Sequence, residues 1–352
     1  MINLTKGNIL EADAEALVNT VNCVGIMGKG IALQFKNAFP ENFKAYESAC
    51  RLNEVKPGRM FVHETGGLYP KYIINFPTKR NWRGKSRIED IESGLAALVK
   101  EVRARNITSI AIPPLGCGSG GLQWVKVSPL INSAFTSLPN VRILLYPPLG
   151  TPTAETMPVR TDRPEMTRSR ALLLRLMERY AIPGYQITLL EIQKMAFFLQ
   201  NAGEKLKLKF ERNKYGPYAE NLHFMLQRLE GHYIRGYGDR TKQAAIRLLP
   251  LASEPAKAFL AGDQEASERL NRVSRLIEGF ETPYGMELLA TVYWIVQENS
   301  SRNLNKENVI AEVHKWSSRK SNLFTPNHIV KALNRLEQHG WISHSLDPAF
   351  TK

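Results

Sequence analysis

The sequence has few cysteines and no long apolar run. Its 352 residues include only three cysteines, which are too scattered to form a disulfide framework or a metal-binding cluster. No stretch approaches the roughly eighteen consecutive apolar residues that would cross a bilayer. The first seven residues are typical of a strand and turn rather than of a signal peptide. We therefore expect a cytoplasmic protein with no membrane association, no bound metal and no cofactor.

The common nucleotide-binding motifs are also absent. Glycine-bearing loops occur, but none fits G-x-G-x-x-G followed by an acidic residue that would read a ribose. None has the lysine of a Walker motif either. The ordinary dinucleotide-binding and P-loop folds are therefore poor matches to this chain.

Two glycine loops are the most informative feature that the sequence does have. The first glycine loop covers residues 21–32 and the second covers residues 113–124. Each follows a short β-branched run and precedes a helix-like pattern. Glycines there let the backbone approach a ligand closely, and the amides at a helix start favour an anion. Two such loops on neighbouring strands can hold the two phosphates of a dinucleotide-like diphosphate.

Length and charge set the outer bounds. A chain of 352 residues suggests two domains, and its net charge of +14 suggests an anionic partner, most simply nucleic acid. The densest basic cluster lies within residues 79–87 and surrounds Trp82. Arginines beside an aromatic ring suit single-stranded nucleic acid, because the cations contact phosphates and the ring stacks on a base. The alternative is a solvated loop with Trp82 in the core, and composition leaves both open.

The first 150 residues alternate between strand-like and helix-like patterns. Expected strands are 2–5, 16–21, 60–64, 72–76, 109–112 and 142–146. Expected helices are 30–39, 41–52, 88–105 and 129–138, the last with Ser128 as its N-cap and Pro129 in its first turn. This alternation predicts a mixed sheet covered on both faces. A Pro/Thr-rich stretch follows, so we expect a first domain over 1–155 and a linker over 156–165.

The remaining residues, 166–352, are expected to form a mainly helical domain. Helical spacing of apolar residues predicts helices at 172–180, 189–202, 218–229, 265–280, 284–298, 306–316 and 326–339. Residues 325–342 have the order helix, glycine, short strand, which is typical of a winged-helix unit. Such a unit reads DNA in some proteins and docks a protein in others; we favour docking.

The motifs together resemble those of a known family. Residues 6–22 and the second glycine loop are similar to the opening and the phosphate loop of a macrodomain, the ADP-ribose-binding α/β module. The resemblance covers roughly residues 1–150 and implies a three-layer α/β fold with a mixed central sheet. Residues 74–82 narrow it to the macrodomain antitoxins that are paired with a DarT toxin, and to the human terminal ADP-ribose protein glycohydrolase.

A shorter resemblance concerns the second half. Residues 192–200 and 215–218 are similar to the SocA-like antitoxin domain. This implies a mainly helical, toxin-binding domain with winged-helix-like units. The partners implied by the two resemblances are ADP-ribosylated single-stranded DNA and a cognate DarT toxin.

The macrodomain resemblance also implies roles for individual residues. Asn22 would hold the distal ribose, and Lys79 would attack its anomeric carbon covalently. Asn8 stands where many macrodomains have an aspartate that reads adenine, so we expect a weaker adenine contact. The residues expected to bind ADP-ribose are Asn8, Ile9, Thr20, Asn22, Gly28, Gly30, Ile31, Gly116, Gly118, Ser119, Gly120 and Gly121. Those expected to contact DNA are Arg80, Trp82 and Arg83.

The second glycine loop departs from the human enzyme in one respect. That enzyme pairs its lysine with an aspartate in this loop, whereas residues 118–121 here contain no carboxylate. Gln123 cannot act as a base. A water, a distant carboxylate or the departing base itself would have to handle the proton. A surface lysine that contacts a DNA phosphate is the alternative role for Lys79.

The hypothesis that follows is an antitoxin with two activities. It would be a hydrolase that removes ADP-ribose from thymine bases of single-stranded DNA, and it would also bind and inhibit its cognate DarT toxin. A non-catalytic ADP-ribose reader and a winged-helix transcription regulator are the alternatives. A phosphatase acting on ADP-ribose 1″-phosphate is a further one.

Overall fold

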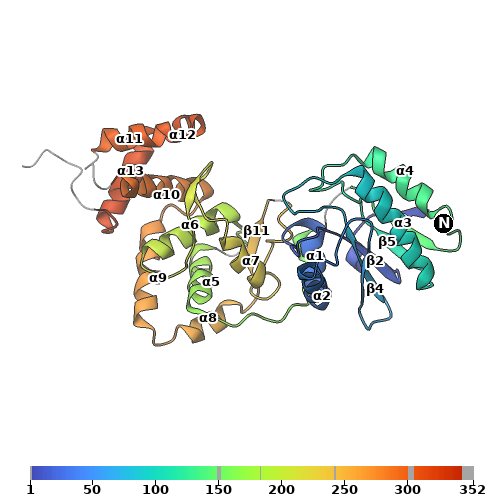
Figure 1. The fold of residues 1–352 in the computed structure, drawn as a ribbon. Helices are drawn as coiled ribbons and strands as arrows, with labels where there is room; N and C mark the ends of the chain where they lie inside the picture. The colour runs from blue at the N-terminus through green and yellow to red at the C-terminus, as the bar shows by residue number, and fades with distance from the viewer. Residues whose placement is uncertain (1, 149–151, 183, 242, 300–304, 343–352) are drawn as a thin grey trace, which may run out of the picture. The chain divides into compact units, whose positions relative to one another are not determined.

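The computed structural model describes residues 2–148, 152–182, 184–241, 243–299 and 305–342, which form two compact units (Figure 1). The first unit comprises Met1–Asp162 and the short segment Gly238–Lys242. The second comprises Arg163–Tyr237 and Gln243–Lys352. Each unit has a hydrophobic core of its own.

A six-stranded mixed sheet forms the centre of the first unit. Its strands are β1 (Ile2–Leu4), β2 (Ala16–Val21), β3 (Phe61–Glu64), β4 (Tyr72–Pro77), β5 (Ser109–Ile112) and β6 (Arg142–Leu145). Their order is β1-β6-β5-β2-β4-β3, and all neighbours are parallel except the edge strand β3, which is antiparallel to β4. The expected strands are therefore confirmed, with ends that differ by one residue at most.

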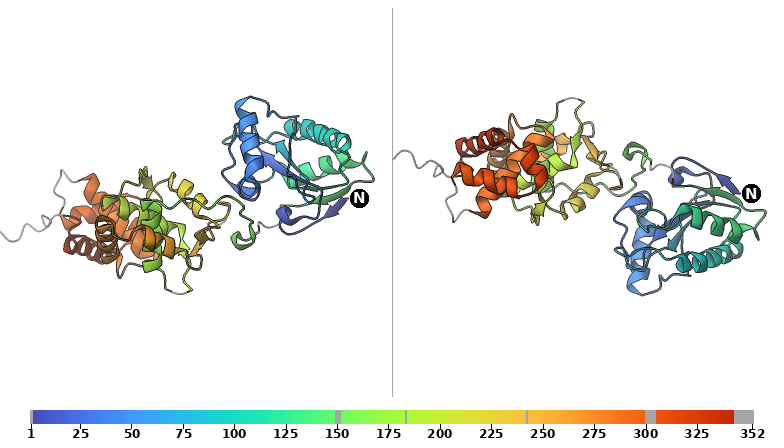
Figure 2. Two further views of the ribbon diagram at one scale, coloured as in Figure 1. Left: turned by 90° about the horizontal axis from the view of Figure 1, so that it is seen from below. Right: turned by 90° about the horizontal axis from the view of Figure 1, so that it is seen from above.

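Helices cover both faces of this sheet, as Figures 1 and 2 show. Helices α1 (Gly30–Ala38) and α2 (Pro40–Arg51) lie on one face, and α3 (Ile88–Ala104) and α4 (Trp124–Phe135) lie on the other. Alternate residues of each strand face opposite layers. In β2, for example, Val18 packs in the core with α3 and α4, whereas Leu17 packs with α1. The three-layer α/β prediction is confirmed.

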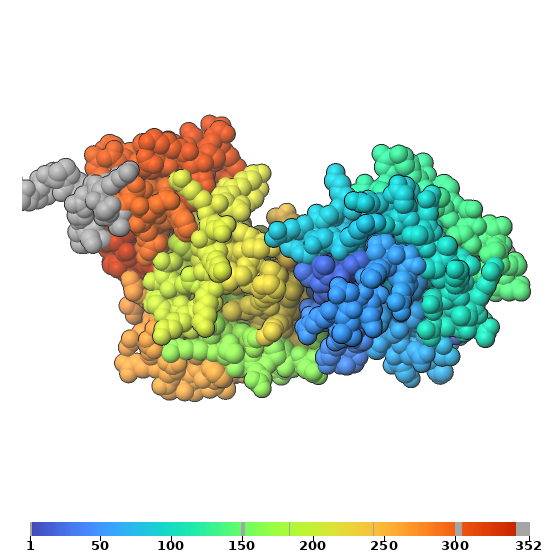
Figure 3. Space-filling model, viewed as in Figure 1, coloured from blue at the N-terminus to red at the C-terminus, as the bar shows by residue number. Residues whose placement is uncertain are grey.

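On the face seen in the space-filling view, α2 and the residues after it form part of the surface (Figure 3).

The start of the last helix in this unit was predicted wrongly. Helix α4 begins at Trp124 with Gln123 as its N-cap, so Ser128 caps nothing and Pro129 lies inside the helix. Val127, Ile131 and Phe135 are buried from this helix. Their helical spacing begins before the proline and outweighs the backbone hydrogen bond that a proline cannot donate.

The second unit is mainly helical, as predicted. Its helices are α5 (Arg168–Tyr180), α6 (Leu189–Asn201), α7 (Leu222–Leu229), α8 (Ser253–Phe259), α9 (Gln264–Ile277), α10 (Pro283–Glu298), α11 (Lys306–Lys315), α12 (Ser318–Leu323) and α13 (Pro326–Gln338). Most enclose one core that includes Phe197, Phe198 and Leu289. Helices α8 and α12 were not expected from the sequence.

Short strands accompany these helices. Strands β7 (Ile187–Thr188), β10 (Ile234–Arg235) and β11 (Ala245–Leu248) form a small antiparallel sheet in the order β10-β11-β7, and β8 (Glu211–Asn213) pairs with β9 (Gly216–Tyr218). Two predictions are corrected here. Tyr218 belongs to β9 rather than to a helix, and within residues 305–342 no strand follows α13. The rest of the expected wing lies outside the described residues.

Among the described residues, no helix is both long enough and apolar enough to span a bilayer. Residues from the expected linker contribute to the first unit, since Met157 is buried there and the Arg160 N–H donates to the Asn37 carbonyl at 2.8 Å.

Candidate functional site

The expected site residues gather at one edge of the first unit's sheet. The two glycine loops follow β2 and β5, which are adjacent and parallel, and Lys79 follows β4, which is parallel to β2 on its other side. The carboxyl ends of parallel strands meet at one edge, which is where open α/β sheets bind ligands. Three sequence segments far apart in the chain thus reach a common surface.

The first glycine loop is closed by the side chain of Asn22. The Asn22 Oδ1 accepts hydrogen bonds from the backbone N–H groups of Val24 (2.9 Å) and Ile26 (3.3 Å), and its Nδ2 donates to the Ile26 carbonyl (2.5 Å). The side chain is almost fully buried. Asn22 therefore shapes the loop in this structure, in addition to the ribose-binding role that the sequence suggested.

The backbone of the first loop passes close to helix α2. Gly25 has a φ of +77°, and a Cβ there would lie 3.4 Å from Glu47 Cγ and 3.5 Å from Cys50 Cβ. A side chain at this position would be strained by its backbone conformation. The loop then leads through Gly28 into α1, which begins with the expected ligand residues Gly30 and Ile31.

Asp239, which also belongs to the first unit, contacts α1. The Gly30 N–H donates to the Asp239 carbonyl at 2.8 Å, and the Gln34 Nε2 donates to Asp239 Oδ2 at 2.5 Å. Gly30 was expected to offer this amide to a phosphate. Nothing in the sequence around residue 239 indicated that it would approach the first glycine loop.

The second glycine loop is a tight turn with two left-handed glycines. Gly116 has a φ of +70° and Gly121 a φ of +79°. The Gly121 N–H donates to the Gly118 carbonyl at 3.0 Å, and the Ser86 N–H donates to the Gly120 carbonyl at 3.0 Å. A Cβ at Gly120 would collide with the Ser86 hydroxyl and with the Gly116 carbonyl. Only glycine fits at residue 120 without movement of its neighbours.

Lys79 lies between the two loops. Its Nζ donates to the Ser119 carbonyl of the second loop at 2.6 Å, while the Cys23 thiol of the first loop donates to the Lys79 carbonyl at 3.3 Å. Burial lowers the pKa of Lys79 below its ordinary value. Because only a neutral amine is nucleophilic, this shift favours the covalent role that the macrodomain resemblance implies.

The charge partners differ between Lys79 and its neighbour. Arg80 pairs with the buried carboxylate of Asp90 at 3.1 Å. Within the described residues no carboxylate pairs with the Lys79 Nζ. Asp90 is thus engaged by Arg80, and none of the described carboxylates replaces the one that the second loop lacks by bonding to this lysine.

The expected DNA-contacting segment is exposed. Trp82 is 47% exposed, and the Arg83 guanidinium lies 4.6 Å from the centre of its ring. The core position considered for Trp82 is therefore ruled out. Arg83 lies over the ring, so a cation and an exposed aromatic face are presented together.

Asn8, which was predicted to contact adenine, has a side chain that makes hydrogen bonds within the protein. Asn8 is the N-cap of the short 3-10 helix η1 (Ile9–Glu11), where its Oδ1 accepts from the Leu10 N–H at 3.1 Å. Its Nδ2 donates to the Thr156 carbonyl, in helix η2 (Ala154–Thr156), at 3.2 Å. Asn8 follows β1 at the same sheet edge as the glycine loops. Ile9 is buried beside it.

Three residues near the site carried no recognisable signal in the sequence. Tyr46 from α2 lies beneath the first glycine loop, Ser86 contacts the second, and Asp90 holds Arg80. Each acts through a contact with a residue at least ten positions away. Short sequence motifs do not contain such pairs, so the motifs did not indicate these residues.

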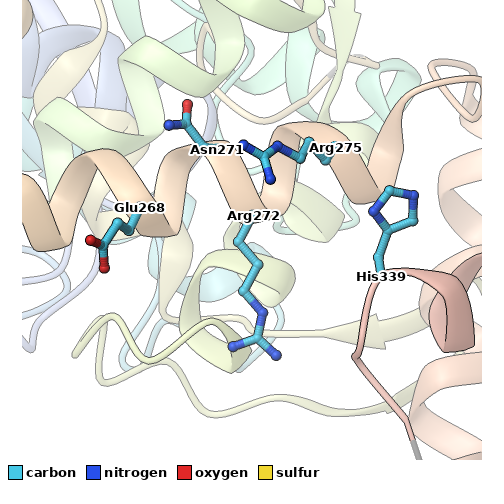
Figure 4. Close-up of a pocket in the computed structure, with 5 residues that line it drawn as sticks. All are labelled: Glu268, Asn271, Arg272, Arg275 and His339. Atoms are coloured by element: carbon cyan, nitrogen blue, oxygen red, sulfur yellow. The ribbon is translucent and has the colours of Figure 1, made fainter.

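A pocket in the second unit is unrelated to this site. It is lined by Glu268, Asn271, Arg272, Arg275 and His339. Figure 4 shows that Arg272 extends from α9 away from Asn271, and the Arg272 guanidinium lies over the Trp341 ring at 4.6 Å. The arginine is therefore used in packing, and the lining groups do not converge on one point.

The chain is similar to known proteins both in its first unit and over nearly its whole length. The Macro domain family matches residues 18–131. A DNA ADP-ribosyl glycohydrolase of Thermus aquaticus is 46% identical over 341 residues, covering 97% of this chain and 94% of the relative. A DNA ADP-ribosyl transferase-DNA ADP-ribosyl glycohydrolase fusion protein of Thermosipho africanus is 32% identical over 164 residues, covering 42% of each chain.

A solved structure matches the first unit. The macrodomain of Mycobacterium tuberculosis DarG is 56% identical and is covered over 98% of its length by 42% of this chain, with a TM-score of 0.42. The near full-length match to the Thermus aquaticus relative decides the family, because it extends through both units. The chain belongs to the DNA ADP-ribosyl glycohydrolases, a family of hydrolases with a macrodomain.

Proposed function

We propose that this protein removes ADP-ribose from thymine bases of single-stranded DNA. The observation that carries the proposal is the position of Lys79. Its Nζ is 2.6 Å from the carbonyl of Ser119 in the second glycine loop, and its own carbonyl is held by Cys23 of the first loop. A ligand whose diphosphate is bound by the two loops would present its distal ribose near this amine.

The chemistry would follow in two steps. The neutral Lys79 amine attacks the anomeric carbon of the distal ribose, and the bond from that carbon to the thymine nitrogen breaks. The departing base takes the electron pair and, through water, the proton that the amine loses. Water then attacks the same carbon, which releases ADP-ribose and restores the amine. A proton path through water and the base suits a site in which no described carboxylate pairs with Lys79.

The remaining contacts would divide between ligand and DNA. Backbone amides of both glycine loops would bind the diphosphate, and Asn22 of the first loop would hold the ribose. Arg80, Trp82 and Arg83 would contact the strand on either side of the modified base. The exposed Trp82 ring and the basic residues around it support this role, since stacking and phosphate contacts together bind single strands.

The test uses a single-stranded oligonucleotide that carries ADP-ribose on one thymine. Incubation with the full chain should release free ADP-ribose and the unmodified oligonucleotide. An oligonucleotide modified on a different base, and the same oligonucleotide in a duplex, are the controls for base and strand specificity. Tight binding without release would favour a non-catalytic reader. Release of phosphate from ADP-ribose 1″-phosphate would favour the phosphatase.

We propose a second function for the helical unit, which is to bind and inhibit a DarT toxin. The helical unit has a separate core, and the expected ADP-ribose residues all lie in the first unit. The transferase–glycohydrolase fusion found in Thermosipho africanus joins the two opposing activities in one chain, which supports a physical partnership between them.

A variant that cannot hydrolyse its substrate tests toxin binding separately from hydrolysis. The full chain with Lys79→Ala should still protect cells that express the toxin and should co-purify with it. If that variant neither protects nor co-purifies, inhibition by binding is wrong. Specific binding of the full chain to an operator sequence would then favour the transcription-regulator alternative.

A further inference from the structure

A buried tyrosine hydroxyl lies beneath the first glycine loop. Tyr46 extends from α2, and its side chain is completely buried. Its Oη lies 2.7 Å from the backbone carbonyl of Asn22 and 3.3 Å from Asn22 Oδ1. Burial raises the pKa of Tyr46 far above its ordinary value, so the hydroxyl stays protonated and remains a donor.

Asn22 links this hydroxyl to the shape of the loop. The oxygen that faces Tyr46 is the same Oδ1 that accepts from the Val24 and Ile26 amides. The Asn22 Nδ2 completes the ring of contacts through the Ile26 carbonyl. A shift of Asn22 would therefore move the turn that leads to Gly28 and Gly30.

We infer that Tyr46 is a positioning residue for the ADP-ribose site, because its hydroxyl fixes Asn22 and thereby presets the first glycine loop. The inference rests on the proposed binding of ADP-ribose by Asn22 and this loop. A loop that already has its bound shape loses less conformational freedom when the ligand binds. Tyr46 itself is too deeply buried to touch the ligand.

Removal of the hydroxyl alone isolates this role. Tyr46→Phe keeps the ring that fills the space under the loop, so the packing of α2 is retained. The Asn22 carbonyl loses its buried donor, and the loop gains freedom. We expect roughly fivefold weaker ADP-ribose binding and a similar loss in kcat/KM, the size of effect that one hydrogen bond produces.

Tyr72→Phe is the matched control. Tyr72 is also buried, but it opens β4, at the end of the strand opposite to Lys79 and the glycine loops. This variant should bind ADP-ribose and release it from DNA as the wild type does. A loss in both tyrosine variants would indicate a general effect of removing a buried hydroxyl.

Local hydrogen exchange distinguishes positioning from stability. In Tyr46→Phe, the amides of Val24 and Ile26 should exchange faster, whereas amides of the second glycine loop should keep their rates. Equal acceleration throughout the first unit would overturn the inference. So would unchanged binding and turnover in Tyr46→Phe.

A double-substitution cycle with Asn22→Ala tests the route of the effect. Asn22→Ala keeps the backbone carbonyl that Tyr46 bonds but removes the side chain that shapes the loop. If Tyr46 acts by positioning that side chain, adding Tyr46→Phe to Asn22→Ala should weaken binding by no more than about twofold. Fully multiplicative losses would overturn the inference. If the wild-type chain neither binds ADP-ribose nor releases it, the proposed function fails instead, and loop exchange still reports on Tyr46.

Discussion

The two glycine loops are built by different means. The first is shaped by side chains, with Asn22 closing its turn and Tyr46 supporting it from α2. The second is held mainly by its own backbone and by Lys79, whose amine binds the Ser119 carbonyl. The first loop is therefore set by the core before any ligand arrives. The second loop and the Lys79 amine share a hydrogen bond, so a change in one should affect the other.

The largest expected effect comes from the residue that joins the second loop to β4. Lys79→Ala removes the proposed nucleophile, and turnover of ADP-ribosylated single-stranded DNA should fall by about 10³-fold or more, measured as released ADP-ribose. Lys79→Arg is the control, because it keeps a cation near Ser119 but offers no neutral amine. Near-normal turnover in Lys79→Arg would show that charge, not nucleophilic attack, is what Lys79 supplies.

The pH dependence of the wild type should follow Lys79. Its pKa is lowered from 10.5 by burial, and the proposed mechanism requires the neutral amine. At pH values below the lowered pKa, kcat/KM should rise about tenfold per pH unit, and it should level off before pH 10.5. The profile is measured with the same oligonucleotide at constant ionic strength. A flat profile between about pH 6 and about pH 9 would contradict the assignment.

A substitution in the second loop should be the next most damaging. Gly120→Ala places a methyl group against the Ser86 hydroxyl and the Gly116 carbonyl, so the loop must move. We expect ADP-ribose binding to weaken by roughly tenfold or more in calorimetry, because the amides lose their arrangement. Binding equal to that of the wild type would mean that this loop adapts and is less rigid than the structure indicates.

The corresponding substitution in the first loop should cost less. At Gly25 a Cβ has contacts of 3.4 and 3.5 Å, which are ordinary, so the main penalty comes from its φ of +77°. Gly25→Ala should destabilise the protein by about 1 kcal/mol, seen as a lower Tm, with a smaller loss of binding than in Gly120→Ala. A larger loss than in Gly120→Ala would reverse the comparison between the loops.

The sequence predicted the first unit well because its signals are local. β-branched runs ended by glycines gave β2 and β5, and these strands placed both loops at one edge. The predicted start of α4 was wrong because Pro129 was assigned to the first turn. The helix begins five residues earlier, at Trp124, and Val127 is buried from it. The family resemblance identified Lys79, but its contact with Ser119 depends on strands that are remote in sequence.

The side-chain contacts that the sequence did not predict join elements that are remote in the chain. A buried chain of amides joins Asn19 in β2 to Asn75 in β4 (2.9 Å) and Asn75 to Asn42 in α2 (2.7 Å). No spacing rule pairs three asparagines that are this far apart. The same holds for Tyr46 under Asn22 and Ser86 against Gly120. Their side chains meet only because the sheet and α2 are already in place.

The position of Cys23 between the two loops affects how the protein responds to electrophiles. Burial, with the nearby Cys50 and Asp90, raises the pKa of the Cys23 thiol to about 11, and burial also raises the pKa of Cys50 and of Cys117. At neutral pH roughly one Cys23 thiol in ten thousand is ionised, and the thiolate is the form that alkylating agents and peroxides attack. The Cys23 thiol, which lies beside the Lys79 carbonyl, should therefore react slowly with oxidants and alkylating agents at neutral pH.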